Sequence, residues 1–388
     1  MRLASLRGLT PLFLLAIGCG AYRLLAEAPP PKIVLLRGEP WCVLPRYDLP
    51  PIATDAQLRA VLERMKPPAG KANTNVLVHA LRLWGPTVDF GDPAIPSGPE
   101  MRAYFLQDAA FQRWAGADAP PLFALDPAGA RVRPALLNNP FEQSGSVHVD
   151  DLLATLGEIG TPLAQPLDTR DGRTSVENLL FGALHRFHLE QQEYEWTAIS
   201  YARFVAPQTS WTNEHGQRIT VEELVDDLIQ HPVEEGVCGG THRLEALVVL
   251  LRVDDQAHFL APRTRRKITV HLGRVSAYLV RAQAPQGYWT RGWIRGAPPR
   301  AGEKLDLGDE ILLTGHHLEW LALAPPEVQP PRETIIRAGQ WLVRAMLEVD
   351  HDTLTKWYGP FSHAARALCL WRSVNPADVW SGAAAAGQ

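Results

Sequence analysis

Apolar residues recur at helical spacing through most of the chain after residue 50, and prolines and glycines separate one run from the next. Strand-like patterns are weak and lie near residues 33–36 and 121–132. The pattern predicts an all-α fold of roughly a dozen helices, with minor β structure near the N-terminus. Apart from runs that begin at capping motifs, the helical runs lie near residues 75–85, 99–114, 148–158, 242–252, 266–284, 309–323, 332–348 and 363–372.

Three threonines are followed three residues later by glutamine or glutamate, which is the spacing of a capping box at a helix N-terminus. Each pair precedes an apolar helical run, so we expect a helix to begin there. The second of these helices is predicted to be long and to continue to about residue 204. The pairs are Thr54 with Gln57, Thr174 with Glu177, and Thr220 with Glu223.

The N-terminus has the layout of a secretory signal. Arg2 and Arg7 form a positive segment, and residues 9–18 are apolar and end in a small residue. Residues 14–19 (Leu-Leu-Ala-Ile-Gly-Cys) resemble a bacterial lipobox, in which a small residue precedes a lipidated cysteine, and this implies lipidation of Cys19. The alternatives are a simple signal peptide and an uncleaved anchor. We predict an extracytoplasmic protein of a bacterial envelope, anchored to a membrane through its N-terminus.

Six histidine positions share one context, because each lies at or near the start of a helical run, after small or loop residues. The irregular intervals between them argue against a solenoid of fixed repeats, but they suit helical hairpins of variable length arranged in a ring. In such a ring alternate helices point their N-termini at a central funnel, so we expect at least three of these positions to share one cavity. They are His79, His148, His185, His242, the pair His316 and His317, and His363.

Residues 273–289 combine an aromatic–leucine pair on a helix with a glutamine, a short turn, a glycine, one further residue and a tryptophan. The residues in these places are Tyr278, Leu279, Gln283, Gly287 and Trp289. The glutamine can cap the helix end, the glycine permits the turn, and the tryptophan stacks back on the assembly. The motif resembles the repeat of squalene–hopene cyclases and the related prenyltransferase toroids. The resemblance implies an α/α-toroid, a ring of helical hairpins around a central funnel.

These features together give an expected domain organisation. The prolines after residue 28 suit a stiff spacer, and the alanine- and glycine-rich end suits a frayed tail. The expected segments are a signal peptide or N-terminal membrane anchor (1–27), a Pro-rich spacer (28–50), a helical N-terminal part that completes or caps the ring (51–170), the toroid (171–375) and a flexible tail (376–388).

The chemistry of the cyclases is not expected to accompany the resemblance. Class II terpene cyclases protonate their substrate with an Asp-x-Asp-Asp motif, whose middle aspartate is the acid. The sequence contains no such motif, and its nearest approaches are the pairs at 226–227 and 254–255 and Asp-His-Asp at 350–352. Squalene-type cyclisation is therefore not predicted.

Cys238 and His242 are the most specific candidates for a metal site. They lie four residues apart at a glycine-rich helix entry, a spacing at which a thiol and an imidazole on one helical face can bind one ion. With His316 from a neighbouring helix they form the predicted metal-binding set, and His317 or His363 are alternative further ligands. Among related toroids, protein prenyltransferases hold zinc through an aspartate, a cysteine and a histidine, and lanthipeptide cyclases use two cysteines and a histidine. The cofactor stays open, with zinc as the candidate, and the alternative is that Cys238 only fills space.

The formal net charge of −4 provides no electrostatic footprint for nucleic acid, so we expect no nucleic-acid partner. The sequence favours a binding or scaffold module whose histidine-rich funnel takes a small molecule, a lipid or a glycan. The alternative is a toroid enzyme, either metal-dependent or acting on a polysaccharide or isoprenoid, with His242, His317 and His363 as candidate catalytic residues. A metal-free site for polysaccharides would also use Trp289 and Glu319.

Overall fold

The computed structural model describes residues 37–70, 73–134, 148–232, 236–300, 302–303 and 306–382. The signal or anchor predicted for 1–27, the lipidation site Cys19 and the strand expected near 33–36 lie outside the described residues. In the described part of the chain, no helix combines the length and the hydropathy that crossing a bilayer requires.

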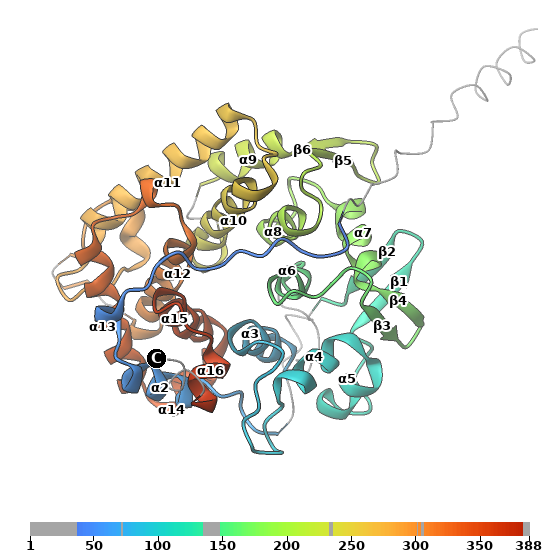
Figure 1. Ribbon diagram of the computed structural model, residues 1–388, viewed down its shortest axis with the longest axis horizontal. Helices are drawn as coiled ribbons and strands as arrows, with labels where there is room; N and C mark the ends of the chain where they lie inside the picture. Colours follow the sequence, from blue (N-terminus) through green and yellow to red (C-terminus); the bar gives the residue numbers. More distant parts are fainter. Residues whose placement is uncertain are drawn as a thin grey trace, which may run out of the picture.

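Helices dominate the described structure, as predicted, and six of them are buried on most sides (Figure 1). A helix buried on all sides lies in the interior, so these six form an inner set. Contacts link them in a closed cycle that runs from α3 through α6, α8, α10, α12 and α15 and back to α3. The inner helices are α3 (Thr74–Trp84), α6 (Asp151–Glu158), α8 (Glu195–Phe204), α10 (Thr241–Ala257), α12 (Leu307–Leu323) and α15 (Tyr358–Trp371).

Other helices lie around this set and bury one face (Figure 1). One of them, α11, buries Ile268, Leu272 and Leu279 at the spacing of a single helical stripe. Each helical run predicted from the sequence coincides with one or two helices of the structure. The helices around the inner set are α2 (Asp55–Arg64), α4 (Gly98–Leu106), α5 (Asp108–Ala115), α7 (Val176–Arg186), α9 (Val221–Gln230), α11 (Pro262–Ala282), α13 (Arg332–Glu348) and α14 (His351–Lys356). Short 3-10 turns lie at η1 (Pro50–Ile52), η4 (Arg291–Arg295) and η5 (Pro326–Val328).

Three antiparallel hairpins of two strands supplement the helices in the described residues. The first lies within residues 121–132, where the sequence predicted weak strand character. The other two were not predicted, because strands of three or four residues are too short to produce a periodic signal. The hairpins are β1 (Phe123–Asp126) with β2 (Gly129–Val132), β3 (Pro166–Thr169) with β4 (Gly172–Ser175), and β5 (Ser210–Thr212) with β6 (Arg218–Thr220).

The prediction of a long helix that starts at Thr174 is wrong. Thr174 lies in β4, where it pairs with Leu167, and α7 begins at Val176. The predicted run is then divided between α7 and α8. Strand pairing therefore overrides the local capping pattern here. The capping boxes predicted at Thr54 and Thr220 are confirmed.

Residues 38–49 form an extended segment, named here the N-terminal strap, that belongs to the folded body. For these residues this corrects our assignment of 28–50 to a spacer; residues 28–36 lie outside the described part of the chain. The blue trace in Figure 1 shows the strap crossing the middle of the view, over the ends of inner helices. Its prolines therefore support an ordered, extended path along the protein surface.

The strap supplies hydrogen-bond partners where inner helices end and their last carbonyls have no partner within the helix. The Tyr47 hydroxyl donates to the Ala324 carbonyl after α12 (2.7 Å). The Leu49 N–H donates to the Trp371 carbonyl at the end of α15 (2.7 Å). Further bonds at the ends of α6, α8 and α10 join Gly38 to Leu163, Trp41 to Arg203 and Ala206, and Cys42 to Gln256.

The segment predicted as a flexible tail (376–388) begins with a helix, which corrects that prediction. This helix, α16 (Pro376–Ser381), packs against α2 and α3. The Trp380 indole donates to the Asp89 carbonyl (2.9 Å) and anchors the helix. An aromatic anchor of this kind outweighs the composition of the residues that follow; residues 383–388 lie outside the described part of the chain.

The turn after α11 has the contacts that its residues predicted. The Gln283 amide donates to the Gly287 and Thr334 carbonyls, both at 2.8 Å. The Trp289 indole donates back to the Leu279 carbonyl (2.8 Å), and its ring is fully buried. The glutamine therefore joins the end of α11 to α13, and the tryptophan closes the turn.

Candidate metal centre

Five histidine side chains meet among the inner helices and form one group, named here the histidine cluster. The His242 ring centroid lies 5.2 Å from that of His316 and 5.7 Å from that of His363. The rings of His316 and His363 stack at 4.1 Å. His79 lies 5.2 Å from His363, and His148 lies 5.9 Å from His242. The cluster thus contains five of the seven histidines that the sequence singled out.

His185 and His317 lie outside the cluster. His185 occupies the last turn of α7 and is far from the start of that helix. His317 follows His316, but successive residues of a helix point about 100° apart. Of the three candidate catalytic residues, His242 and His363 are therefore brought together, and His317 is not. The rings around His317 are those of Trp289, Trp293 and Trp320.

Not every cluster histidine lies at a helix start, which corrects the interpretation of the sequence. His242 is the second residue of α10, but His316 lies in the middle of α12. Gly315 marks a close approach between helices and not a loop, since a Cβ atom there would lie 2.7 Å from the Cα of Ala364. This contact brings α12 against α15 and allows His316 to stack on His363.

Backbone hydrogen bonds fix the tautomer of two cluster histidines. Nδ1 of His79 donates to the Asn75 carbonyl, and Nδ1 of His316 donates to the Leu312 carbonyl, each at 2.7 Å. A carbonyl oxygen only accepts, so the proton lies on Nδ1 and Nε2 carries a lone pair. The same backbone support behind the ring is common for imidazoles that bind metals.

The cluster also contains buried nitrogen atoms with no hydrogen-bond partner among the described residues. These are both ring nitrogens of His242 and Nε2 of His316. Leaving a buried polar atom unpaired costs about 1–3 kcal/mol, so each case requires an explanation. In His363, Nδ1 contacts Glu319 (2.6 Å) and Arg82 (3.2 Å), and these contacts do not use Nε2. The cluster thus offers lone pairs in excess of donors, which suits a cation.

Cys238 joins the cluster through a left-handed turn. Cys238, Gly239 and Gly240 have φ angles of 52°, 66° and 75° immediately before α10. Glycine adopts this conformation freely, but cysteine does so at a cost, and such costs concentrate at functional sites. The spacing of Cys238 and His242 therefore works through this turn and not, as predicted, through one helical face. The ligand atoms of Cys238, His242 and His316 all lie within 4.8 Å of one another.

These three side chains are the predicted metal ligands, and their chemistry fits zinc, which prefers thiolate and imidazole. Ligand atoms around one tetrahedral zinc ion lie roughly 3.3–3.8 Å apart, so small side-chain rotations would complete the site. Within the described ranges, no other group of three or more histidine, cysteine or acidic side chains converges as closely. Three protein ligands leave a fourth position open, as in catalytic zinc sites.

Burial keeps the imidazoles in the protonation state that metal binding needs. It lowers the pKa of His316 to about 3. Burial and the neighbouring histidines lower the pKa of His242 well below its ordinary range, so both rings are neutral at pH 7. Burial also raises the pKa of the Cys238 thiol to about 12, although the positive charge of Arg291 acts to lower it. A bound cation would supply the charge that stabilises the thiolate fully.

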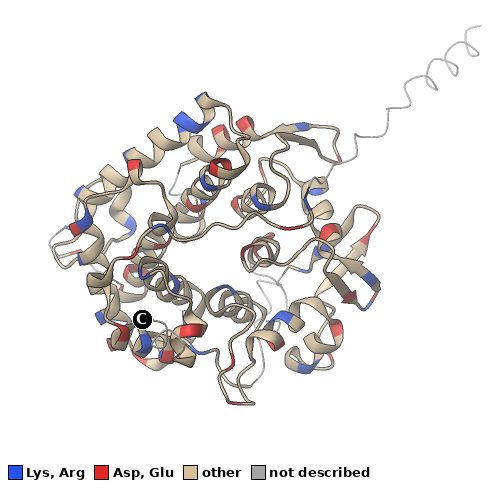
Figure 2. Cartoon of the chain, in the orientation of Figure 1, with Lys and Arg blue, Asp and Glu red and all other residues tan. Residues whose placement is uncertain are grey.

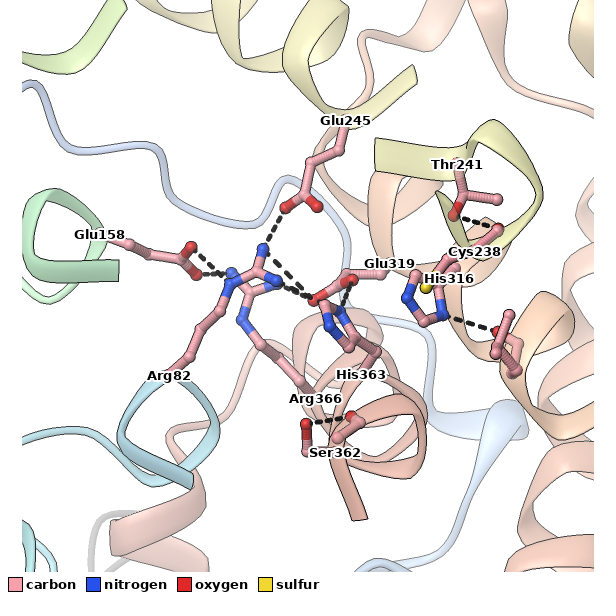
Figure 3. A network of polar contacts seen from close by, with 12 residues as sticks. Arg82, Glu158, Cys238, Thr241, Glu245, His316, Glu319, Ser362, His363 and Arg366 are labelled. Atoms are coloured by element: carbon pink, nitrogen blue, oxygen red, sulfur yellow. Dashed lines mark hydrogen bonds and ion pairs between the residues drawn. The ribbon is translucent and has the colours of Figure 1, made fainter. Parts of the chain in front are cut away.

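A layer of buried charges, named here the charge layer, lies beside the histidine cluster (Figure 3). Arg82 pairs with Glu158 at 2.9 Å and also with Glu245 and Glu319. Arg366 pairs with Glu158 and Glu319. Two guanidiniums thus face three carboxylates. Burial raises the pKa of Glu319 well above its ordinary range, as expected where negative charge is in excess.

One sequence spacing, which was not among the predicted features, relates the histidine cluster to the charge layer. Four inner helices carry histidine followed three residues later by arginine or glutamate, which places the second residue one turn further along the same face. Each helix therefore presents an imidazole to the cluster and a charge to the layer. Its recurrence is the signal that would have identified the charged residues. The pairs are His79 and Arg82, His242 and Glu245, His316 and Glu319, and His363 and Arg366.

A surface pocket of about 230 Å³ reaches the edge of the histidine cluster. His148 lines this pocket, and its ring also contacts His242, one of the three candidate ligands. A molecule in the pocket would therefore be one side chain away from the candidate metal position. The lining residues include Arg131, His148, Asp150, Arg186 and Gln191.

Comparisons of the protein with family models, with curated proteins and with solved structures give no match. One fold can host many chemistries, so the site has to carry the functional argument. The features of this site that bear on function are the lone pairs, the thiol and the charge layer.

Proposed function

We propose that the protein binds one divalent transition-metal ion, best matched by Zn²⁺, through Cys238, His242 and His316. The carrying observation is that the three ligand atoms converge within 4.8 Å, while the nitrogens of His242 and Nε2 of His316 have no hydrogen-bond partner among the described residues. Calcium and magnesium prefer oxygen ligands, so a thiol and two imidazoles favour zinc or a similar ion.

The charge layer supports a divalent ion. Once Glu319 is ionised, which its raised pKa opposes in the metal-free protein, the two guanidiniums of Arg82 and Arg366 and the three carboxylates of Glu158, Glu245 and Glu319 leave one negative charge. A divalent ion bound by one thiolate and two neutral imidazoles has one positive charge. The two groups therefore neutralise each other, which matters because an uncompensated buried charge is costly.

The proposal includes the α/α-toroid fold and the location suggested by the sequence. The closed cycle of six inner helices and the Gln–Gly–Trp turn support a toroid like those of squalene–hopene cyclases and prenyltransferases. The apolar N-terminal segment and Cys19 support an exported protein that is tethered to a membrane. Without an Asp-x-Asp-Asp motif, cyclase activity is not part of the proposal.

The open fourth position favours a metal-dependent enzyme over the binding or scaffold module that the sequence favoured. An ion in such a site acts as a Lewis acid toward a bound substrate. Glu319 contacts Nδ1 of His363 and orients its ring, which stacks on His316. His363 is therefore the candidate proton acceptor beside the ion.

The test is the metal content of the full chain, purified in mild detergent with zinc present and then dialysed. Native mass spectrometry and plasma emission should find one zinc ion per chain, and His242→Ala should contain none. His317→Ala is the matched control, because it removes a buried histidine outside the cluster and should keep the ion. A wild-type protein without zinc, or a His242→Ala protein with the wild-type amount, would refute the proposal.

Cobalt substitution gives a second readout that does not depend on activity. Co²⁺ bound by the Cys238 thiolate should show a sulfur-to-metal charge-transfer absorption. Cys238→Ser should remove this band, and Cys42→Ser, at an exposed cysteine outside the cluster, should leave it intact. A band that survives in Cys238→Ser would exclude Cys238 as the ligand.

A further inference from the structure

The outer helix α11 has a charge that differs from that of the whole chain. The chain has a formal net charge of −4, but α11 carries basic residues and no acidic ones. Figure 2 shows the basic positions along this helix at the edge of the molecule. The basic residues are Arg263, Arg265, Arg266, Lys267, Arg274 and Arg281.

Four of these six charges are available to a partner. Arg265 is paired with Asp254 and Asp255 at 2.8 Å, and Lys267 is paired with Asp226. The other four side chains are exposed and have no ion pair with any described residue. Their spacing places them along one side of the helix. They are Arg263, Arg266, Arg274 and Arg281.

Apolar side chains interrupt this row of arginines. Val270 is 44% exposed, Tyr278 is 42% exposed and Val280 is 37% exposed. The Arg281 guanidinium lies over the Tyr278 ring at 5.0 Å, which covers one face of the ring. On one surface of the helix, the exposed arginines can make polar contacts, and the intervening valines and tyrosine can make apolar contacts. We name these seven residues the α11 basic face.

The shape of this face indicates which kind of partner can bind it. A helix of 21 residues is about 30 Å long. α11 lies on the outside of the molecule, so its face is convex and extended and not a pocket for a small ligand (Figure 1). The surface that matches it is broad and carries many negative charges.

We propose that the α11 basic face binds the surface of a bilayer that contains anionic lipids. Arginines attract anionic headgroups, tyrosine is favoured at the level of the headgroups, and exposed valines can enter the boundary with the acyl chains. A nucleic acid or an acidic protein would use the arginines but would not require Val270 and Val280 between them. The inference is independent of the proposed metal site, since none of the seven residues belongs to it.

The test compares the binding of the full chain to two kinds of vesicle, phosphatidylcholine alone and phosphatidylcholine with about 30% phosphatidylglycerol. The ratio of the two partition coefficients isolates the electrostatic contribution, because any contribution of the N-terminal segment is the same in all variants. Each basic side chain near an anionic surface strengthens binding about five-fold. Replacing all four arginines by glutamine should therefore lower the ratio by roughly 600-fold.

A matched control removes four exposed arginines elsewhere, on α5 and on the hairpins. This control should keep the wild-type ratio, although its net charge equals that of the α11 variant. About 1 M salt should abolish the preference of the wild type for anionic vesicles. An unchanged ratio in the α11 variant, or an equal loss in the control, would overturn the proposal. Equal affinity of the wild type for polyglutamate or RNA would overturn it as well. The control residues are Arg113, Arg131, Arg173 and Arg218.

Discussion

The N-terminal strap and the histidine cluster both involve the inner helices, but they differ in whether their polar atoms have hydrogen-bond partners. Along the strap, carbonyls at the ends of α12 and α15 receive donors from Tyr47 and Leu49. In the cluster, both nitrogens of His242 and Nε2 of His316 are buried without a partner in the described residues. One region satisfies its hydrogen bonds within the chain, and the other leaves acceptors unused.

This difference separates the contacts that stabilise the inner helices from the groups that are available to a ligand. Carbonyls at helix ends that accept a hydrogen bond from the strap add stability and require no ligand. Unused buried acceptors, and a cysteine with a positive φ angle, lower the stability of the protein by itself. A protein that retains such features gains from them elsewhere, and the proposed binding of a cation would be that gain.

The largest effect should come from breaking the charge layer. Arg82→Met leaves Glu245 without a guanidinium partner and leaves Glu158 and Glu319 with Arg366 alone, so it should lower the free energy of unfolding by about 3–5 kcal/mol. Urea denaturation of the metal-free protein measures the change. The control is Arg291→Met, which breaks an exposed pair with Asp309 and should cost less than about 1 kcal/mol. Equal losses in the two variants would mean that the charge layer is not a buried network.

Zinc should stabilise the protein through the cluster and not through the strap. At a free concentration about a hundred times its Kd, Zn²⁺ should raise the free energy of unfolding by about 2.7 kcal/mol. His316→Ala should lose this increment, because it removes a ligand, and Tyr47→Phe in the strap should keep it. Denaturation with and without a chelator measures the increment. An undiminished increment in His316→Ala would place the ion elsewhere.

A smaller effect of opposite sign should follow when His242 becomes leucine. This variant removes two buried nitrogens without partners, so the metal-free protein should gain about 1–2 kcal/mol of stability while it loses the ion. Thermal and urea denaturation in the presence of a chelator measure the gain. A clear loss of stability would show that His242 is satisfied in the native protein, and the contrast with the strap would fail.

The smallest effect should come from one hydrogen bond of the strap. Tyr47→Phe removes the donor to the Ala324 carbonyl but keeps the ring that stacks on Trp371 at 5.0 Å. The free energy of unfolding should fall by about 1 kcal/mol, and the zinc content should stay the same. A change in zinc content would show that the strap and the cluster are coupled.

Local sequence signals predicted local structure well where nothing competed with them. The capping boxes at Thr54 and Thr220 begin helices, as expected. The same spacing at Thr174 did not, because hairpin pairing with Leu167 took that residue into a strand. A capping motif indicates only that the backbone can begin a helix there. At Thr174, pairing across the hairpin favoured a strand instead.

The composition of the candidate site was predicted better than its geometry. Cys238, His242 and His316 were singled out and do converge. Their route to convergence was not readable, because the left-handed turn at Cys238 and the close contact of Gly315 with Ala364 depend on packing between distant segments. To predict the charge layer from the sequence, several helices have to be compared at once, because a single histidine followed three residues later by a charged residue is common by chance.

The strap also determines the order in which the chain can complete its fold. Tyr47 and its acceptor Ala324 are 277 residues apart, and Leu49 bonds to Trp371 at the end of the last inner helix. During synthesis the strap therefore precedes all six inner helices, and its residues Tyr47 and Leu49 find their partners last. Such distant pairs close late because the entropy of a long loop must be overcome first. Until α15 is complete, the ends of the earlier helices remain uncovered, and the growing chain is most exposed to incorrect pairing at that stage.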